Sequence, residues 1–421
     1  MMKTEGPARS LPQESDEQTA TPAASSTEAW WRRLLTADIG SLPVLLGLIL
    51  IAAIFQYANP NFLTPLNLTN LLVQISAVGT IAVGIVLVLL IGEIDLSVGA
   101  VSGLCAGIMA VLSVKNGLPS GLAILIGIGC GAAIGLLHGW WLARLHVPSF
   151  VVTLAGLLGW QGALLYVLGN TGTINLTDPF VTGLANARLP VFLGWVGGAG
   201  AVPLYAALQI RQRQQKVRAG LPAHSILVLI GYILLVALPL AGAIALMSVN
   251  RNPNPNVPIA GIPSGVLIFL AFILLFDFIT QRTRFGRYIF AVGGNAEAAR
   301  RAGINVELVR ILVFVLSSTL AACGGILAAS RLFAVNQSSG SGDLLLNAIA
   351  AAVIGGTSLF GGRGSTWSAL LGALVIGAIA NGMDLLAFSS SIRFMVTGAV
   401  LLVAVTLDSY TRSRRESSGR F

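Results

Sequence analysis

Long apolar segments alternate with short polar ones over most of this chain. Twelve apolar runs of 17 to 24 residues are separated by loops rich in Gly, Pro, Asn and Arg. A helix needs about 20 apolar residues to cross the hydrocarbon core of a bilayer. The pattern therefore predicts an all-α, polytopic membrane protein of about 10–12 transmembrane helices, at residues 40–57, 71–91, 97–114, 119–142, 149–169, 191–210, 225–248, 262–280, 309–330, 344–360, 365–387 and 391–408.

Composition supports lipid as the solvent of this protein. The 421 residues are 55% hydrophobic and 10% charged, with a mean hydropathy of +0.84. A soluble domain has about 25% charged residues, so this chain has too little polar surface to cover itself in water. Most classes of soluble enzyme are excluded, and membrane lipid is the first predicted partner.

The distribution of charge predicts the orientation. The net charge is +9, but the basic residues lie in alternate loops, which needs no nucleic acid to explain it. Twelve crossings place both termini on one side, together with 20 of the 25 Lys and Arg residues. The positive-inside rule makes that side cytoplasmic, in a multi-pass membrane protein. The five basic residues outside are Lys115, Arg188, Arg251, Arg331 and Arg393.

Three regions follow along the chain. Residues 1–29 are rich in Ser, Thr, Pro, Glu and Gln and predict a disordered cytoplasmic tail. Residues 30–408 form the transmembrane domain, and residues 409–421 form a basic cytoplasmic tail. Polar or glycine-rich breaks at 92–97 and 361–364 are either loops or re-entrant turns within the membrane.

The inner loop 281–308 contains signals for a short helix. Asn295 is a good N-cap, and Gly303 is a natural left-handed C-cap. Glu297 in the first turn and Arg300 and Arg301 in the last turn suit the helix dipole. A helix of about eight residues is unstable alone in water. It therefore needs a surface, which is either the membrane or a partner protein.

Polar residues inside apolar runs are candidates for a transport pathway. Glu93, Asp95 and Ser97 allow two interpretations: a proton relay, or a helix break capped by Asp95 with Glu93 facing water or an arginine, which is the favoured one. The glycines of 355–364 are expected to bend the backbone near the pathway. Each of the remaining polar candidates could instead make an interhelical hydrogen bond; they are Gln74, Gln161, Asn347, Thr357 and Asn381.

The sequence contains no recognisable catalytic or metal-binding cluster. Its three cysteines are isolated and its three histidines (His138, His146 and His224) lack metal-ligand spacing. A phosphate-binding Walker A loop needs a Lys that follows Gly, and none of the three lysines does. We therefore expect no enzyme activity, no cofactor and no metal.

Three segments resemble one known family. They are GGNAEAARRAGINV at 293–306, IGEIDLSVGAVSGL at 91–104 and AAVIGGTSLFGGRGS at 351–365. All three are similar to segments of the bacterial ABC-importer permeases for simple sugars (ribose, arabinose and xylose), and the resemblance covers roughly 40–408. The chain departs from the usual pattern at Glu93, where Gly is commoner. That departure and the additional stretch at 190–260 are most similar to the xylose-type permeases.

The resemblance implies a fold like the type II ABC-importer permeases and a specific division of labour. A separate cytosolic P-loop ATPase would hydrolyse ATP, and a substrate-binding protein would deliver a monosaccharide, with D-xylose the leading candidate. The permease would work as two copies, as a homodimer. Acidic lobes of the binding protein could dock on Arg188, Arg251 and Arg331, although ordinary solvated loop charge is the favoured interpretation of these residues. The ATPase would grip the coupling segment through Gly293, Gly294, Asn295, Glu297, Ala298, Ala299, Arg300, Arg301 and Gly303.

Three alternatives stay open. An ABC permease for another small solute, such as branched-chain amino acids, fits the same motifs. An ion-coupled secondary transporter would use Glu93 and Asp95 as its relay. An integral-membrane enzyme would need a polar cluster near the lipid interface, which the sequence does not offer.

Overall fold

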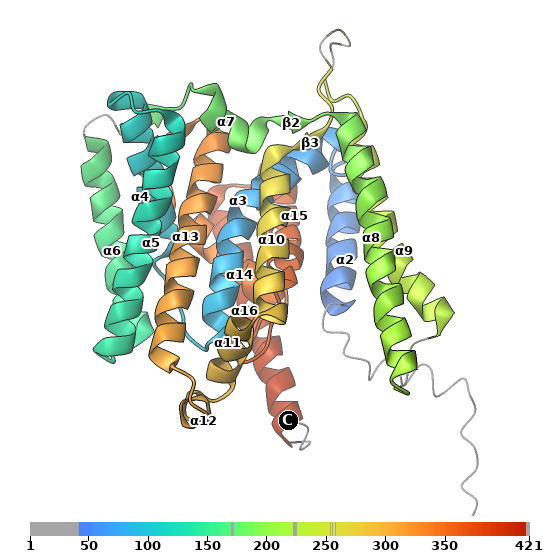
Figure 1. The fold of residues 1–421 in the computed structure, drawn as a ribbon. Coiled ribbons are helices and arrows are strands. Elements are labelled where there is room, and N and C mark those ends of the chain that lie inside the picture. The colour runs from blue at the N-terminus through green and yellow to red at the C-terminus, as the bar shows by residue number, and fades with distance from the viewer. Residues whose placement is uncertain are drawn as a thin grey trace, which may run out of the picture. The chain divides into compact units, whose positions relative to one another are not determined.

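The computed structural model describes residues 42–417, apart from 170, 171, 222–224, 253, 255 and 257. The predicted N-terminal tail, His224 and the last four residues of the predicted C-terminal tail lie outside this part. The described chain is almost entirely helical (Figure 1). Its helices are α2 (Leu42–Ala58), α3 (Pro65–Leu90), α4 (Val98–Ala110) with the π-helical turn η1 (Val111–Lys115), α5 (Ser120–Arg144), α6 (Ser149–Leu168), α7 (Pro179–Asn186), α8 (Val191–Arg218), α9 (Ile226–Ser248), α10 (Ser264–Arg282), α11 (Arg284–Gly294), α12 (Ala296–Arg301), α13 (Val306–Leu332), α14 (Asp343–Ile354), α15 (Trp367–Leu385) and α16 (Ser390–Ser417).

Most of these helices have membrane-spanning dimensions. Within the described residues, nine are long and apolar enough to cross a bilayer, and three shorter apolar helices occur at 44–58, 343–354 and 390–403. In Figure 1, α7 lies at the upper end of the helices and α12 at the lower end, and these ends are called the α7 end and the α12 end below. The all-α, polytopic fold predicted from the sequence is confirmed.

The predicted spans match helices, with one error. The prediction of a single helix over 344–360 is wrong in its second half, because α14 stops at Ile354. Gly355 and Gly356 follow, and Gly356 has φ +104°, which only glycine adopts easily. The 12 residues of α14 are about 18 Å long, against the roughly 30 Å of a hydrocarbon core. α14 is therefore a half-length helix.

α13 forms the centre of the helical packing, with α3, α4 and α5 around it. Glycine at every fourth position of one face of α5 allows that helix to cross α13 at close range. A Cβ on Gly131 would lie 2.7 Å from the Ser318 carbonyl oxygen, and one on Gly139 would lie 2.7 Å from the Ile311 Cα. Small residues allow such backbone approach in lipid, where packing has to replace the hydrophobic effect.

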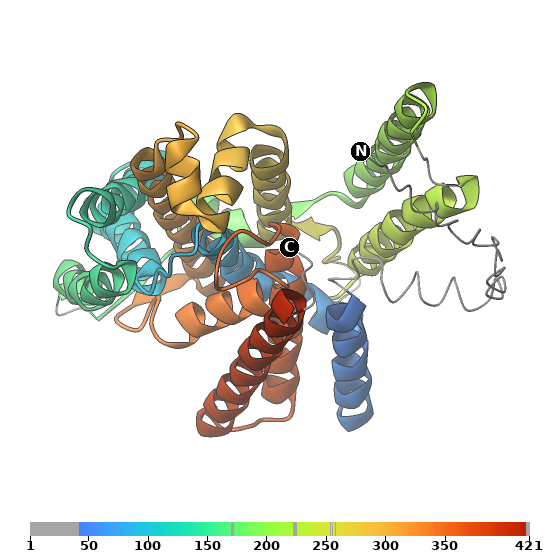
Figure 2. The same ribbon diagram turned by 90° about the horizontal axis from the view of Figure 1, so that it is seen from below.

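Two short antiparallel pairs of strands connect distant parts of the chain. β1 (Thr173–Asn175) pairs with β4 (Ala334–Asn336), with Thr173 opposite Asn336. β2 (Arg188–Leu189) pairs with β3 (Ile262–Pro263) at the α7 end (Figure 1). The second pair holds the base of a hairpin formed by α8 and α9. That hairpin stands to one side of the other helices when seen from below (Figure 2).

Candidate functional site

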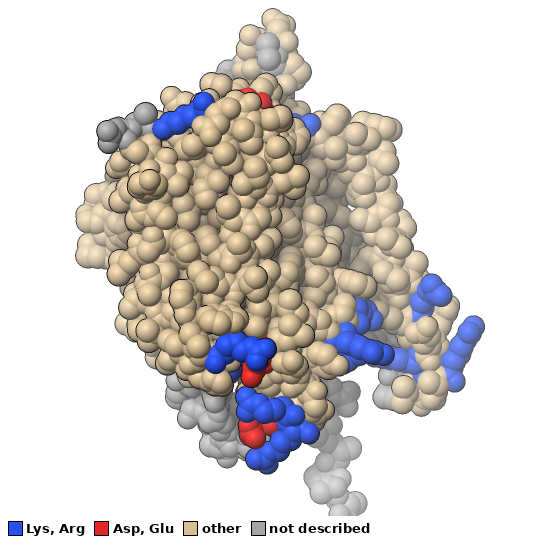
Figure 3. Space-filling view, turned by 60° about the vertical axis from the view of Figure 1, so that its left-hand side comes forward, with Lys and Arg blue, Asp and Glu red and all other residues tan. Residues whose placement is uncertain are grey.

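Positive charge gathers at the α12 end. In Figure 3 most Lys and Arg atoms lie along this end and few along the opposite one, with an uncharged flank between them. All five basic residues predicted on the outer side belong to elements that begin or end at the α7 end: η1, β2, the loop before β3, α13 and α16. The helix directions therefore agree with the topology predicted from the loops.

The α12 helix protrudes at this basic end. The Asn295 side-chain oxygen accepts from the backbone N–H of Ala298 at 2.9 Å, and Gly303 ends the helix region with φ +84°. Both predicted caps are confirmed, although the helix has six residues instead of about eight. Ala299 is buried against the chain. Glu297 pairs with Arg300 at 2.8 Å and with Arg301 at 3.3 Å on the exposed face.

A second helix, α11, precedes α12 and was not expected from the sequence. The side chain of Thr283 caps it by accepting from the backbone N–H of Gly286 at 3.2 Å. Ile289 and Val292 are buried on one face, whereas Arg287 and Tyr288 are exposed on the other. The apolar and polar residues here alternate at helical spacing, so the helix could have been predicted from the sequence. α11 connects α10 to Gly293 and Gly294, directly before α12.

Three glycine-rich segments meet where α11 ends. The backbone N–H of Gly362 donates to the Leu90 carbonyl at 2.9 Å. A Cβ on Gly293 would overlap that same carbonyl oxygen, and one on Gly361 would lie 2.7 Å from the Gly293 carbonyl oxygen and 2.9 Å from Gly92 N. We call Leu90, Gly92, Gly293, Gly361 and Gly362 the glycine junction. It joins the coupling segment to both helix breaks through backbone atoms.

The first break, residues 91–97, contains an ion pair beside the glycine junction. Glu93 pairs with Arg310 of α13 at 3.1 Å, and both side chains are largely buried. Glu93 therefore meets an arginine, as the structural interpretation expected. The pair connects the break directly to α13, the central helix of the packing.

The same break continues into a buried polar chain. Asp95 Oδ1 accepts from the Ser97 hydroxyl at 2.6 Å, and the Ser97 oxygen lies 3.4 Å from His138 Nδ1 of α5. Trp160 Nε1 of α6 donates to His138 Nε2 at 2.9 Å. Asp95 also accepts from the Ser97 backbone N–H at 2.9 Å, and so it shapes the turn before α4. Nothing in the sequence connects His138 and Trp160 with this break, because the link exists only in three dimensions.

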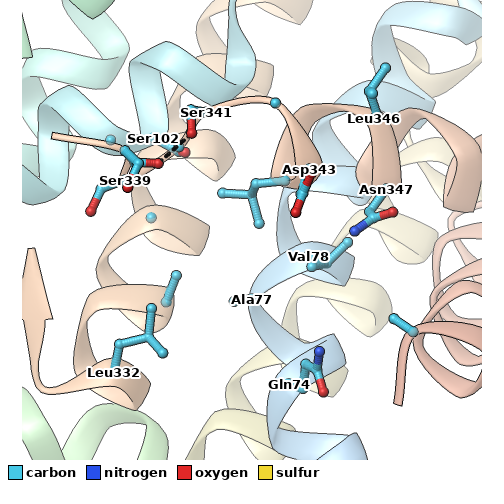
Figure 4. A pocket seen from close by; sticks show the side chains of 18 of the residues that line it. Gln74, Ala77, Val78, Ser102, Leu332, Ser339, Ser341, Asp343, Leu346 and Asn347 are labelled. Atoms are coloured by element: carbon cyan, nitrogen blue, oxygen red, sulfur yellow. Dashed lines mark hydrogen bonds between the residues drawn. The ribbon is translucent and has the colours of Figure 1, made fainter. Parts of the chain in front are cut away.

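A cavity of about 540 Å³ lies between the first half of α3, the ends of α13 and α15, and the segment leading into α14 (Figure 4). It reaches the α7 end at Leu332, Asp384 and Arg393. Towards the α12 end, α3 is buried continuously from Gly79 to Leu90, so the packed core closes the cavity on that side. The half-length helix α14 begins at the cavity with Asp343.

The cavity wall combines small and apolar side chains with several amides and hydroxyls. Gln74, Asn347, Ser102 and Ser341 line it together with Asp343. Near the mouth, Asp384 and Arg393 form an ion pair with each other, and Arg331 stands beside them. Amides and hydroxyls in such numbers suit a solute that offers many hydrogen-bonding groups and no net charge.

The structure separates the predicted pathway residues. Gln74 and Asn347 line the cavity. Asn381 does not: its amide exchanges two hydrogen bonds, of 2.7 and 3.0 Å, with Asn67. Gln161 donates to the Gln337 carbonyl at 2.9 Å, and Thr357 is buried next to Gly364. Glu93, Asp95 and Ser97 lie in the first break, as described above.

The outer arginines differ in how exposed they are. Arg251 is only 9% exposed and donates to the carbonyls of Met247, at 2.6 Å, and Gly261, at 3.1 Å. Arg251 is therefore neither a docking charge nor the solvated loop charge that the sequence favours, because its guanidinium is held by these two backbone carbonyls. Arg188 remains exposed, and Arg331 is half-buried at the cavity mouth.

Membrane-length helices, two broken segments, a polar cavity and a protruding helix at the basic end define a multi-pass membrane permease. The chain belongs to the family described as branched-chain amino acid transport system / permease component, which matches residues 67–405. No solved structure matches the chain.

Individual relatives give a more specific comparison than the family as a whole. The xylose transport system permease protein XylH of Escherichia coli K12 is 38% identical over 353 residues, covering 84% of this chain and 87% of that protein. XylH of Haemophilus influenzae is 35% identical over 383 residues, covering 91% and 99%. The ribose import permease protein RbsC of Bacillus subtilis is 33% identical over 364 residues, covering 86% and 91%.

Proposed function

We propose that this protein is the membrane subunit of an ATP-driven sugar importer whose solute is a pentose such as D-xylose. Relatives named for xylose and ribose transport support this solute class, and so do the amides and hydroxyls in the cavity wall. The α7 end faces outwards and the α12 end faces the cytoplasm of a bacterial inner membrane. Both termini lie on the cytoplasmic side.

The glycine junction is the observation that carries the mechanism. A separate cytosolic P-loop ATPase grips the exposed face of α12, formed by Glu297, Ala298, Arg300 and Arg301. When ATP binding moves α12, Gly293 moves with it, and backbone contacts pass the motion to Gly92 and to the 361–362 turn. Gly92 lies just after the end of α3, and the 361–362 turn comes after α14. Both of these helices line the cavity. The ATPase must bind α12 differently in the two states, since equal affinity would shift nothing.

A second copy of this chain completes the pathway. Leu346, beside Asn347 in α14, and Phe394 in α16 line the cavity and are exposed, at 40% and 52%. An opening bordered by such apolar side chains would place Gln74 and Asn347 next to lipid, where unsatisfied polar groups are costly. Pairing across this opening encloses the polar wall. A binding protein then delivers sugar at the α7 end, where Arg188 and Arg331 are available to acidic side chains.

Reconstitution tests the proposal. Liposomes containing the chain, its ATPase and its binding protein should take up labelled xylose with ATP, and take up little labelled leucine. A proton gradient without the ATPase should give no uptake. Accumulation by the chain alone on an ion gradient would establish the secondary transporter instead, and preferential leucine uptake would establish an amino acid permease.

Two sets of variants probe the two ends separately. Ala299→Pro removes the Ala299 N–H bond to Asn295, which is 2.9 Å long, and breaks α12. It should abolish uptake while leaving the melting temperature of the bundle nearly unchanged. Gln74→Leu and Asn347→Leu should raise the KM for sugar by about fivefold each, since one hydrogen bond contributes about 1 kcal/mol, and should leave ATPase binding intact.

A further inference from the structure

The buried residues of the α8–α9 hairpin lie near its α7 end. Its buried residues are Gly194 in α8 and Ile244 and Met247 in α9, all close to the turns that join it to β2 and β3. A Cβ on Gly194 would lie 3.1 Å from Ile262 Cδ1, so this end is tightly packed. No residue of the half nearer the α12 end is buried among those the structure describes. The described part of the chain therefore leaves that half uncovered.

The length of α8 sets the position of its charges in a bilayer. The apolar stretch 191–210 is 20 residues, or about 30 Å, which matches one hydrocarbon core. α8 continues to Arg218 without a break, which adds about 12 Å. The headgroup layer on each side is about 5–8 Å thick. The last two turns of α8 therefore cross that layer.

Four cations occupy these two turns: Arg211, Arg213, Lys216 and Arg218. At 100° per residue, Arg211 and Arg218 point to one side and Arg213 and Lys216 to the opposite side. The sequence has no Asp or Glu between Asp178 and Asp277, so the hairpin has no carboxylate of its own to neutralise them. The result is a belt of positive charge at headgroup depth around a helix that the rest of the protein leaves uncovered.

We propose that Arg211, Arg213, Lys216 and Arg218 form a binding site for anionic phospholipid headgroups, which anchors the α12 end of the α8–α9 hairpin. Charge complementarity identifies the occupant, because phosphate is the anion present at that depth in every bilayer. Each Lys or Arg near an anionic surface gains about fivefold in affinity. Guanidinium groups add paired hydrogen bonds to phosphate oxygens. Lipid bound here fixes the hairpin where protein contacts are lacking.

Native mass spectrometry of the purified full chain tests this site, with phosphatidylglycerol as the anionic probe and phosphatidylcholine as the zwitterionic one. The chain should retain phosphatidylglycerol preferentially. The variant R211Q/R213Q/K216Q/R218Q should bind the lipid on the order of several hundredfold more weakly. The charge-preserving variant R211K/R213K/R218K should keep most of it. Inorganic phosphate should not displace the lipid at equal concentration, since it lacks acyl chains to lie along the apolar part of α8.

A matched control separates a site from diffuse attraction. R282Q/R284Q/R287Q/R363Q removes four exposed cations elsewhere at the α12 end and should lose little phosphatidylglycerol. Equal loss in both quadruple variants overturns the proposal, and so does full retention in the hairpin variant. Retained lipid together with lost ATPase binding would assign the belt to a protein partner instead. Unchanged melting temperatures show that the variants fold. Transport does not enter the test, so its outcome is independent of the proposed function.

Discussion

Replacing Gly293 by alanine tests the glycine junction directly. A Cβ at Gly293 would overlap the Leu90 carbonyl oxygen and lie 2.7 Å from Gly362 N. Ordinary contact begins near 3.4 Å, so the contact with Gly362 N alone requires a separation of about 0.7 Å, and the overlap with the Leu90 oxygen requires more. Overpacking of this kind costs about 1–3 kcal/mol. If the strain falls on the state that transport requires, uptake should drop by about tenfold to a hundredfold.

Gly294 provides the matched control, since a Cβ there meets nothing within 4 Å. Gly294→Ala makes the same chemical change one residue away and should transport normally, with stability equal or up to about 1 kcal/mol higher. The assay is ATP-driven xylose uptake in liposomes, with ATP hydrolysis measured in parallel. Gly293→Ala should hydrolyse ATP with little uptake. Normal uptake by Gly293→Ala, or equal losses in both variants, would refute the role of the junction.

Further predictions concern caps and buried pairs. Asn295→Ala should cost about 1 kcal/mol of α12 stability and lower uptake. Asn295→Asp keeps the cap and should transport normally. Equal uptake by the two variants would show that the cap is not needed for coupling. Asn381→Ala should destabilise the chain by about 0.6–1.7 kcal/mol in thermal melting, because the Asn67 amide loses its two hydrogen bonds to Asn381. A changed preference between xylose and ribose would instead indicate that Asn381 lines the pathway. Glu93→Gln should cost about 1–2 kcal/mol by leaving Arg310 without its partner, and Glu93→Gln/Arg310→Gln should recover part of it. ATP-driven uptake should survive in that double variant; abolished uptake at an unchanged melting temperature would restore the proton relay.

Helix identity was accessible from the sequence because lipid imposes a simple length rule. The exact helix ends were less so. α3 starts six residues before the predicted span, since Thr64 caps it by accepting from Asn67 N at 3.4 Å and Pro65 fills the first position. α14 ends early because two glycines outweigh an apolar run. Apolar content cannot distinguish a half-length helix from a full one when the next residues are also apolar.

The site was predicted in pieces and assembled only by the fold. The sequence identified Asn295, Gly303 and the two breaks, since caps and glycines have local signatures. It did not connect Gly92, Gly293 and Gly361, which are far apart along the chain. Amides inside helices are ambiguous for the same reason: Gln74 faces a cavity while Asn381 faces another amide, and nothing in their neighbouring residues tells the two apart.

The contacts of the glycine junction are made by the backbone, whereas the exposed surface of α12 is made by side chains. Main-chain atoms carry the contacts among Leu90, Gly293 and Gly362, whereas the outward surface of α12 consists of replaceable side chains. Grafting another permease's outward α12 residues onto this chain should therefore redirect which motor subunit it accepts without disturbing how force is relayed inside. Under the proposed function, the side chains of α12 would determine recognition of the ATPase, and the backbone contacts of the glycine junction would transmit its motion.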